Sequence, residues 1–198
     1  MRGPPLPGMP RSLRPDTAGA VHHVWARGAL KQTIFPDDDD HLHYLRQLTR
    51  VVKWTSWRCL AWCLMSNHVH LLIETPRPNL SRGMQRLHGV YGYEFNKRHG
   101  GSGCVFEKRF GSNPIEDEIE LWVVASYIAN NPVTAGLCAL PQDWRWGSHR
   151  AVFEGRSAPG VDTARLLSYF SSLGGEPRER YLAYVAANTK SHIKGLTL

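Results

Sequence analysis

The stretch that most constrains the fold is 57–75, in which two apolar runs are joined by the short polar turn 65–67. The first run, 57–64, is rich in aromatic and apolar residues, as expected of a buried strand. Met65, Ser66 and Asn67 then favour a tight reversal. The second run, 67–74, is also strand-like. We therefore expect an antiparallel hairpin whose second strand lies in the interior of a sheet.

The second strand of this hairpin carries two histidines. Side chains alternate between the two faces of a strand, so His68 and His70 project together while Val69, Leu71 and Ile73 form an apolar face. Two neutral imidazoles one pleat apart can share a divalent cation. A His-x-His pair is more often two unrelated histidines, so the pair alone does not establish a metal site.

The rest of the chain adds strands and helices in a regular order. Period-two alternation predicts strands at 21–27 and 104–113. Apolar residues at three- and four-residue steps predict helices after 37–40, after a cap at Asn79 or Ser81, and after 116–120, the last closed by Asn131-Pro132. The resulting order, βαββαβ followed by a helix, predicts an α+β, ferredoxin-like fold with an antiparallel sheet.

The run Asp37 to Asp40 precedes the first predicted helix. An aspartate at this position accepts a hydrogen bond from the first turn, and further acids favour the positive end of the helix dipole. A metal site is the alternative interpretation, and the cap is the better supported. The apolar side of that helix is expected to comprise Leu42, Leu45, Leu48 and Val52.

Composition bounds the domain organisation. We expect a basic, proline-rich flexible arm at 1–20, one domain at 21–151, and a helical C-terminal extension at 152–198 with short helices at 163–170 and 178–187. The excess of 24 Lys and Arg over 17 Asp and Glu gives +7, which suits a polyanionic partner or simply maintains solubility.

Targeting and cysteine patterns point to the cytoplasm. The first 20 residues lack the apolar core of a signal peptide, and we find no apolar run long enough to cross a membrane. Cys59, Cys63, Cys104 and Cys138 do not form the paired spacing of a zinc ribbon, and we expect them to act as small buried hydrophobic residues.

A second pair of candidate residues lies on the third predicted helix. Tyr127 and Asn131 are four residues apart and therefore share a helix face. If that face covers the histidine strand, two imidazoles and an amide oxygen can hold a divalent ion, and the phenol can attack a phosphorus atom. The alternative for Tyr127 is a half-buried tyrosine with a structural hydrogen bond. Spacing alone leaves both possibilities open.

Several motifs resemble one known family. Residues 63–75, which contain the histidine pair, resemble the histidine motif of the REP-associated tyrosine transposases, single-tyrosine HUH transposases of the IS200-like superfamily. The segments 26–28, 34–35, 79–85, 95–99, 106–110, 127–137 and 143–148 agree with the family in the same order. The resemblance covers roughly 20–151, and it departs from the family pattern at Ala29, Ala129 and 147–149.

The resemblance implies an activity and assigns roles. Tyr127 would be the catalytic nucleophile that forms a 5′-phosphotyrosine with single-stranded DNA, and His68, His70 and Asn131 would hold Mg or Mn. The implied partner is single-stranded or palindromic hairpin DNA, bound by a monomer or homodimer associated with the nucleoid. The candidate DNA-binding residues are Arg27, Arg82, Arg86, Lys97, Arg98, Lys108 and Arg109.

Two other functions fit the same fold. A domesticated DNA-binding protein would keep the fold without turnover, although the intact histidines and Tyr127 argue against it. An RNA-binding ferredoxin-like module would stack bases on aromatic residues of the sheet, for which Phe106 and Phe110 are candidates. Histidines at the centre of the sheet suit that role poorly.

Overall fold

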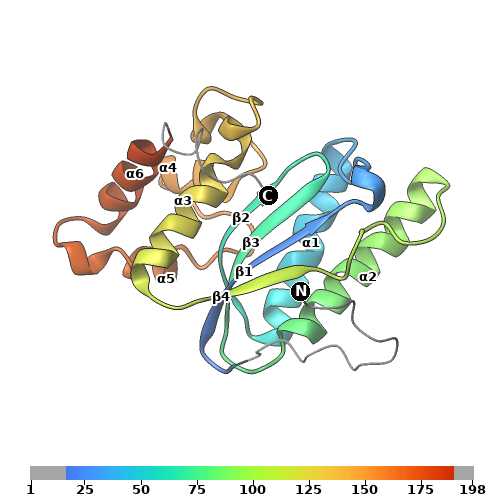
Figure 1. Cartoon of the computed structure of the whole chain (residues 1–198), viewed down its shortest axis with the longest axis horizontal. Helices are drawn as coiled ribbons and strands as arrows, with labels where there is room; N and C mark the ends of the chain where they lie inside the picture. The colour runs from blue at the N-terminus through green and yellow to red at the C-terminus, as the bar shows by residue number, and fades with distance from the viewer. Residues whose placement is uncertain (1–16, 190–198) are drawn as a thin grey trace, which may run out of the picture.

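The computed structural model describes residues 17–189, which form a four-stranded antiparallel sheet with helices on both faces (Figure 1). Its strands are β1 Ala20–Arg27, β2 Arg58–Leu64, β3 His68–Thr75 and β4 Gly111–Ile115, in the spatial order β2-β3-β1-β4. The predicted α+β class and the hairpin of β2 with β3 are therefore confirmed. The histidine strand β3 lies between β2 and β1, in the interior of the sheet.

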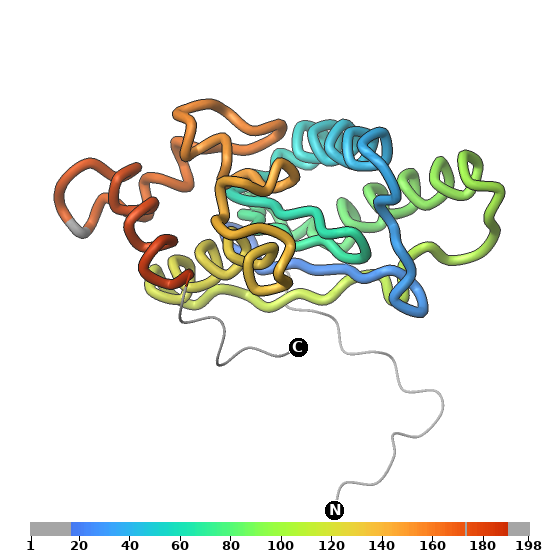
Figure 2. Tube along the Cα trace, turned by 90° about the horizontal axis from the view of Figure 1, so that it is seen from above, coloured from blue at the N-terminus to red at the C-terminus, as the bar shows by residue number. Residues whose placement is uncertain are grey.

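The helices divide between the two faces of the sheet (Figures 1 and 2). The α-helices are α1 Asp38–Thr55, α2 Leu80–His99, α3 Glu118–Thr134, α4 Ser148–Phe153, α5 Thr163–Ser168 and α6 Pro177–Asn188, and short 3-10 turns lie at Ala29–Lys31, Pro141–Asp143 and Ser171–Leu173. Helices α1 and α2 share one core with the sheet, whereas α3, α5 and α6 share a second core on the opposite face. None of the helices in 17–189 is long and apolar enough to cross a membrane.

Strand alternation decides which residues each core receives. Val69, Leu71 and Ile73 of β3 belong to the core under α1 and α2. The intervening His68 and His70 therefore point to the face covered by α3, as the alternation predicted. The pairing of β1 with β3 places Arg27 opposite His68 and Trp25 opposite His70, on the same face.

The predicted strand 104–113 is wrong in its bounds, because β4 covers Gly111–Ile115. The preceding segment instead turns Val105, Phe106 and Phe110 into the core under α1 and α2, and only an isolated bridge joins Phe106 to Gly28. Because these side chains are buried, their spacing in the sequence resembles the alternation of a strand. Pro114 is accommodated because β4 is at the edge of the sheet, where a missing N–H is tolerated.

Two helix predictions also need correction. Helix α3 does not close at Asn131-Pro132 but continues to Thr134 with Pro132 inside it. Proline forfeits only one helical bond near the end, and the last turn closes because Leu137 N–H donates to the Pro132 carbonyl. On α1, Leu42 is exposed, because the buried face runs through His41, Tyr44, Leu45 and Leu48 instead.

The acidic run forms the predicted cap. Asp37 is the N-cap of α1, and its side chain accepts from Asp40 N–H at 3.1 Å. Asn79 precedes α2, but its side chain bonds Trp57 and the Thr55 carbonyl instead of the helix end. The cysteine prediction holds only in part, since Cys59 and Cys63 are buried whereas Cys104 is exposed and Cys138 is half-buried.

The C-terminal region packs directly on α3. Leu166, Phe170, Tyr181 and Val185 belong to the same apolar cluster as Ile128 of α3. The short helices expected at 163–170 and 178–187 correspond to α5 and α6, and the boundary expected at 151 falls inside α4. The N-terminal arm lies outside the described residues as far as residue 16.

Candidate active site

The two candidate pairs meet across the sheet and α3. His68 Nε2 lies 3.2 Å from Asn131 Oδ1. The His70 and Tyr127 ring centroids are 5.3 Å apart, with the rings edge to face. Helix α3 therefore does cover the histidine strand, and the four side chains of the expected constellation form one site.

Both strand histidines are held neutral at neutral pH. Burial lowers the pKa of His70 well below its usual value of 6.5, and the neighbouring His23 and His68 lower it further. Burial also lowers the pKa of His68, against an opposing effect of its hydrogen bond to Asn131. A neutral imidazole keeps the lone pair that coordinates a cation.

The free lone pairs of the site fit a divalent ion. Both ring nitrogens of His68 face amide oxygens, Nδ1 at 2.7 Å from Asn67 Oδ1 and Nε2 at 3.2 Å from Asn131 Oδ1, and a neutral ring can donate to only one of them. The tautomer that donates to Asn67 leaves the Nε2 lone pair for a cation that the Asn131 oxygen would also bind. His70 Nε2 is buried without a hydrogen-bond partner among the described residues. Two imidazole nitrogens and an amide oxygen suit Mg or Mn less strongly than carboxylates would, and they leave positions open for substrate oxygens.

A metal ion at this site would need the Asn131 amide oxygen as its third ligand. Within 17–189, no cluster of three or more His, Cys, Asp or Glu side chains is arranged to hold a metal ion.

His23 is a site residue that the sequence did not single out. It projects from β1 on the same face as His70, and its Nε2 lies 3.1 Å from His70 Nδ1. The two rings stack with centroids 5.3 Å apart, and His23 also touches the edge of Tyr127. If His70 coordinates through Nε2, its Nδ1–H donates to His23, which fixes the orientation of the ligand. Its same-side alternation with Trp25 was the only signal in the sequence.

Tyr127 is protonated at neutral pH. Burial raises the pKa of its phenol, while the hydrogen bond to Asn131 and the nearby charge of Arg27 act in the opposite direction. Tyr91, by contrast, lies on α2 across the sheet and donates to the Ile34 carbonyl. Tyr127 is therefore the tyrosine at the histidine pair.

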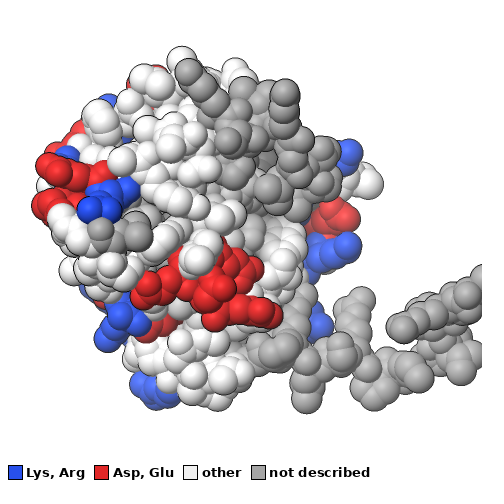
Figure 3. Space-filling model, turned by 60° about the vertical axis from the view of Figure 1, so that its left-hand side comes forward, with Lys and Arg blue, Asp and Glu red and all other residues white. Residues whose placement is uncertain are grey.

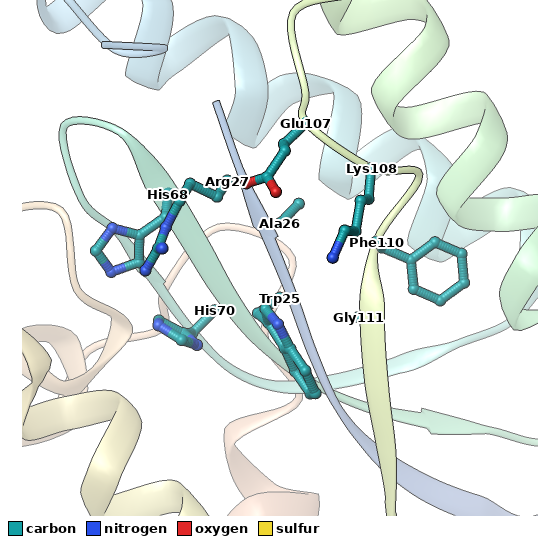
Figure 4. Close-up of a pocket in the computed structure, with 9 residues that line it drawn as sticks. All are labelled: Trp25, Ala26, Arg27, His68, His70, Glu107, Lys108, Phe110 and Gly111. Atoms are coloured by element: carbon teal, nitrogen blue, oxygen red, sulfur yellow. The ribbon is translucent and has the colours of Figure 1, made fainter. Parts of the chain in front are cut away.

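A cavity of about 360 Å³ opens beside the histidine pair (Figure 4). Its lining comprises Trp25, Ala26, Arg27, His68, His70, Glu107, Lys108, Phe110 and Gly111. Strands β1 and β3 supply one wall, and the segment entering β4 supplies the other. Of the seven predicted DNA-binding residues, Arg27 and Lys108 line this cavity.

The other predicted DNA-binding residues are distributed elsewhere. The Arg82 and Arg86 guanidiniums each lie 4.9 Å from the centre of a Trp54 ring, on the side of α1 and α2. Lys97 is exposed near the end of α2, and the exposed Arg109 follows Lys108. The Arg98 guanidinium binds Asp37 with oxygen distances of 2.7 and 2.8 Å and also contacts Asp40.

Acidic side chains gather on the side of the molecule that carries α3 and α6 (Figure 3). The first turn of α3 contributes Glu118 and Glu120, with Asp117 as its cap. The excess of positive charge is therefore unevenly distributed, and this side is less suited to a polyanion than the cavity with Arg27 and Lys108.

Comparisons with known proteins agree with the architecture. The family model described as "Transposase IS200 like" matches residues 17–131, more than half of the chain. A solved REP-associated tyrosine transposase bound to a REP hairpin shares the fold, with a TM-score of 0.61 and 18% identity over 78% of this chain and 93% of that one. A search of curated proteins finds no match. The match over residues 17–131 shows that the chain belongs to the IS200-like transposase family.

Proposed function

We propose that this protein is a metal-dependent single-strand DNA endonuclease and strand transferase that uses Tyr127 as its nucleophile. The supporting observation is that Tyr127 and Asn131 lie on α3 directly over His68 and His70. At this position the buried His70 Nε2 without a partner among the described residues, the His68 ring and the Asn131 oxygen all lie beside the Tyr127 phenol.

His68, His70 and Asn131 would hold Mg or Mn. When bound, the ion would polarise a phosphate oxygen and stabilise the negative charge that develops on it. The protein's own contribution is to keep both imidazoles neutral by burial and to orient His68 through Asn67.

Tyr127 would carry out the covalent step. Its Oη forms a bond to the phosphorus as the bond from phosphorus to the 3′ oxygen breaks, which leaves a 5′-phosphotyrosine and a free 3′-hydroxyl. In the net reaction the phenol proton is transferred to the 3′ oxygen. Arg27, whose charge acts on Tyr127 and both histidines, is placed to offset the charge of the phosphate.

Palindromic hairpin DNA with single-stranded flanks is the proposed substrate. The net charge of +7 suits a polyanion, and the solved transposase with this fold is bound to a REP hairpin. We further propose that residues 21–151 form the catalytic domain, with 152–198 as a helical extension, and that the protein works at the cytoplasmic nucleoid.

The experiment that tests this function is covalent trapping. Protein incubated with Mn and 3′-labelled hairpin DNA should give a shifted, protease-sensitive band on denaturing electrophoresis. Tyr127→Phe removes one oxygen and should abolish the band while leaving DNA binding intact. Tyr93→Phe is the matched control, since Tyr93 is exposed on α2 and should have no effect. A band that survives Tyr127→Phe would exclude Tyr127 as the nucleophile.

The same experiment separates the rival functions. A domesticated binding protein would bind the hairpin with high affinity and give no adduct with any metal. An RNA-binding module would prefer single-stranded RNA to the DNA hairpin of equal sequence.

A further inference from the structure

The cavity beside the histidine pair has a composition that phosphate binding alone does not explain. Arg27 and Lys108 suit phosphates, but Glu107 places a carboxylate at the same opening. Within 17–189, the Glu107 side chain forms no hydrogen bond and no ion pair, so neither Arg27 nor Lys108 is bonded to its carboxylate. An anion at a DNA-binding cavity repels the backbone and must be balanced by another interaction.

Trp25 supplies an aromatic wall to the same cavity. The Trp25 indole packs against Gly111 of the neighbouring strand β4. A Cβ atom on residue 111 would lie only 2.2 Å from the indole ring. Any larger residue at 111 would therefore displace the indole. The absence of a side chain at Gly111 keeps Trp25 in place beside the cavity.

The side chains converge in the space above Trp25 (Figure 4). Glu107 and Lys108 extend from the segment before β4 towards β1, and His68 and His70 lie on the other side of Trp25. A volume of about 360 Å³ is at the lower end of the range for ligand pockets, which suits one nucleoside and excludes a duplex.

We propose that this cavity binds a single unstacked nucleobase that carries an exocyclic amino group, cytosine before the others. Trp25 stacks on the base, Glu107 accepts a hydrogen bond from the amino group, and Lys108 contacts the adjoining phosphate. Because His68 and His70 form part of the wall, the base belongs to the single strand next to the bond that Tyr127 attacks. This inference rests on the proposed function, and it names which nucleotide chemistry that site selects.

Binding of hairpin DNA with varied single-stranded flanks tests the proposal. The Tyr127→Phe background prevents cleavage, and fluorescence anisotropy measures affinity as each flanking nucleotide is changed in turn to deoxycytidine, deoxyuridine or an abasic residue. Deoxyuridine replaces the amino group of deoxycytidine with a carbonyl oxygen. At one flanking position we expect deoxycytidine to bind about tenfold more tightly than deoxyuridine, and the abasic residue to bind more weakly still.

Variants assign that preference to the cavity. Glu107→Gln should remove the preference, because an amide can face either an amino group or a carbonyl, whereas the exposed Glu116→Gln removes the same charge elsewhere and should retain it. Trp25→Leu should weaken binding about tenfold by loss of stacking, and Trp25→Phe should recover most of it. Gly111→Ala should mimic Trp25→Leu by displacing the indole.

Three results would overturn the proposal: no flanking position that prefers deoxycytidine, a preference that survives Glu107→Gln, or full affinity in Trp25→Leu. Adduct formation on the same oligonucleotides by the protein with Tyr127 intact separates the two proposals. An adduct without a base preference refutes only the base pocket, and a base preference without an adduct refutes only the nuclease.

Discussion

Two buried histidines on opposite faces of the sheet, His88 and His70, are bonded in different ways. On the face under α1 and α2, His88 stacks on Phe106 with centroids 4.1 Å apart, donates to the Arg109 carbonyl and accepts from the Tyr44 hydroxyl. On the face under α3, the buried His70 Nε2 has no hydrogen-bond partner among the described residues. His88 has both ring nitrogens bonded, whereas His70 keeps one nitrogen available as a ligand. Within 17–189, His41 Nε2 and His43 Nε2 on α1 are also buried without a partner, so the neighbours of His70, namely His68, Asn131 and Tyr127, are what distinguish it.

This difference has an energetic meaning. Leaving a buried polar atom without a partner costs about 1–3 kcal/mol, which stable cores avoid. At His70 the unpartnered nitrogen lies beside His68, Asn131 and Tyr127, where a bound ion would restore the lost interaction. The comparison therefore predicts that the two histidines respond oppositely when each is removed.

The largest effect should come from His70→Ala. Loss of one ligand should reduce cleavage of hairpin DNA at least ~10³-fold, because the ion supplies several kcal/mol of charge stabilisation. Binding driven by phosphate contacts should largely remain. Initial rates of cleavage with Mn, together with anisotropy on the same DNA, measure the two quantities. Undiminished cleavage by this variant would remove the metal site from the mechanism.

The matched change on the opposite face is His88→Ala. It leaves the Tyr44 hydroxyl and the Arg109 carbonyl unpaired and opens a cavity beside Phe106, so the free energy of unfolding should fall by about 3 kcal/mol. Cleavage per folded molecule should be unchanged. Urea unfolding and Mn-dependent cleavage of the same preparations provide the comparison. If His88→Ala lost activity but not stability, the contrast between the faces would fail.

Acid should reveal the same histidine in the unmutated protein. Burial lowers the pKa of His88 to about 4, so between about pH 6.5 and 4 the unfolded chain takes up a proton that the folded chain does not. The free energy of unfolding therefore falls as pH decreases through that window. We expect the fall between pH 7.5 and 5 to be about 2 kcal/mol smaller in His88→Ala, measured by urea unfolding. Equal pH dependence would show that folding does not lower the pKa of His88.

Much of this fold could be predicted from the sequence, because burying one face of a strand makes apolar residues recur at every second position. Val69, Leu71 and Ile73 alternate with the histidines along β3, and that alternation alone placed the strand and its functional face. The fourth strand was misplaced because Phe106 and Phe110 are buried without being paired in the sheet. Apolar spacing records which residues are buried, and it does not record which backbone groups are bonded to a neighbouring strand.

The site was predictable only as far as local spacing reached. His68 with His70, and Tyr127 with Asn131, are each neighbours on one element, and the family resemblance supplied the link between the pairs. His23 lies 47 residues from its partner His70, so its role depends on the register of β1 against β3. Glu107 and Trp25 likewise line one cavity only because β4 and the segment before it pass beside β1.

The contribution of His23 is expected to be intermediate in size. His23→Phe keeps a flat ring but removes the acceptor for His70 Nδ1, so Mn affinity should fall about 10–100-fold, as for other residues that orient a metal ligand. Calorimetric titration with Mn measures this in the absence of DNA. His23→Asn, which can still accept a hydrogen bond, should recover part of the affinity. A purely structural role would instead lower stability in both variants and leave Mn affinity unchanged.

The smallest effects are expected from removing single Arg or Lys side chains. These variants test whether positive charges on the two faces of the sheet contribute equally to DNA binding. Each phosphate contact that is lost should reduce the slope of log affinity against log salt by about one. Arg27→Gln and Lys108→Gln remove cations that line the cavity and should each show that reduction. Arg98→Gln should leave the slope unchanged, because the Arg98 guanidinium is already paired with Asp37 and Asp40. Loss of these ion pairs should lower stability slightly. Anisotropy titrations of hairpin DNA at several salt concentrations measure the slopes. A reduced slope in Arg98→Gln would mean that DNA displaces the two aspartates and that the surface of α1 and α2 also binds the substrate.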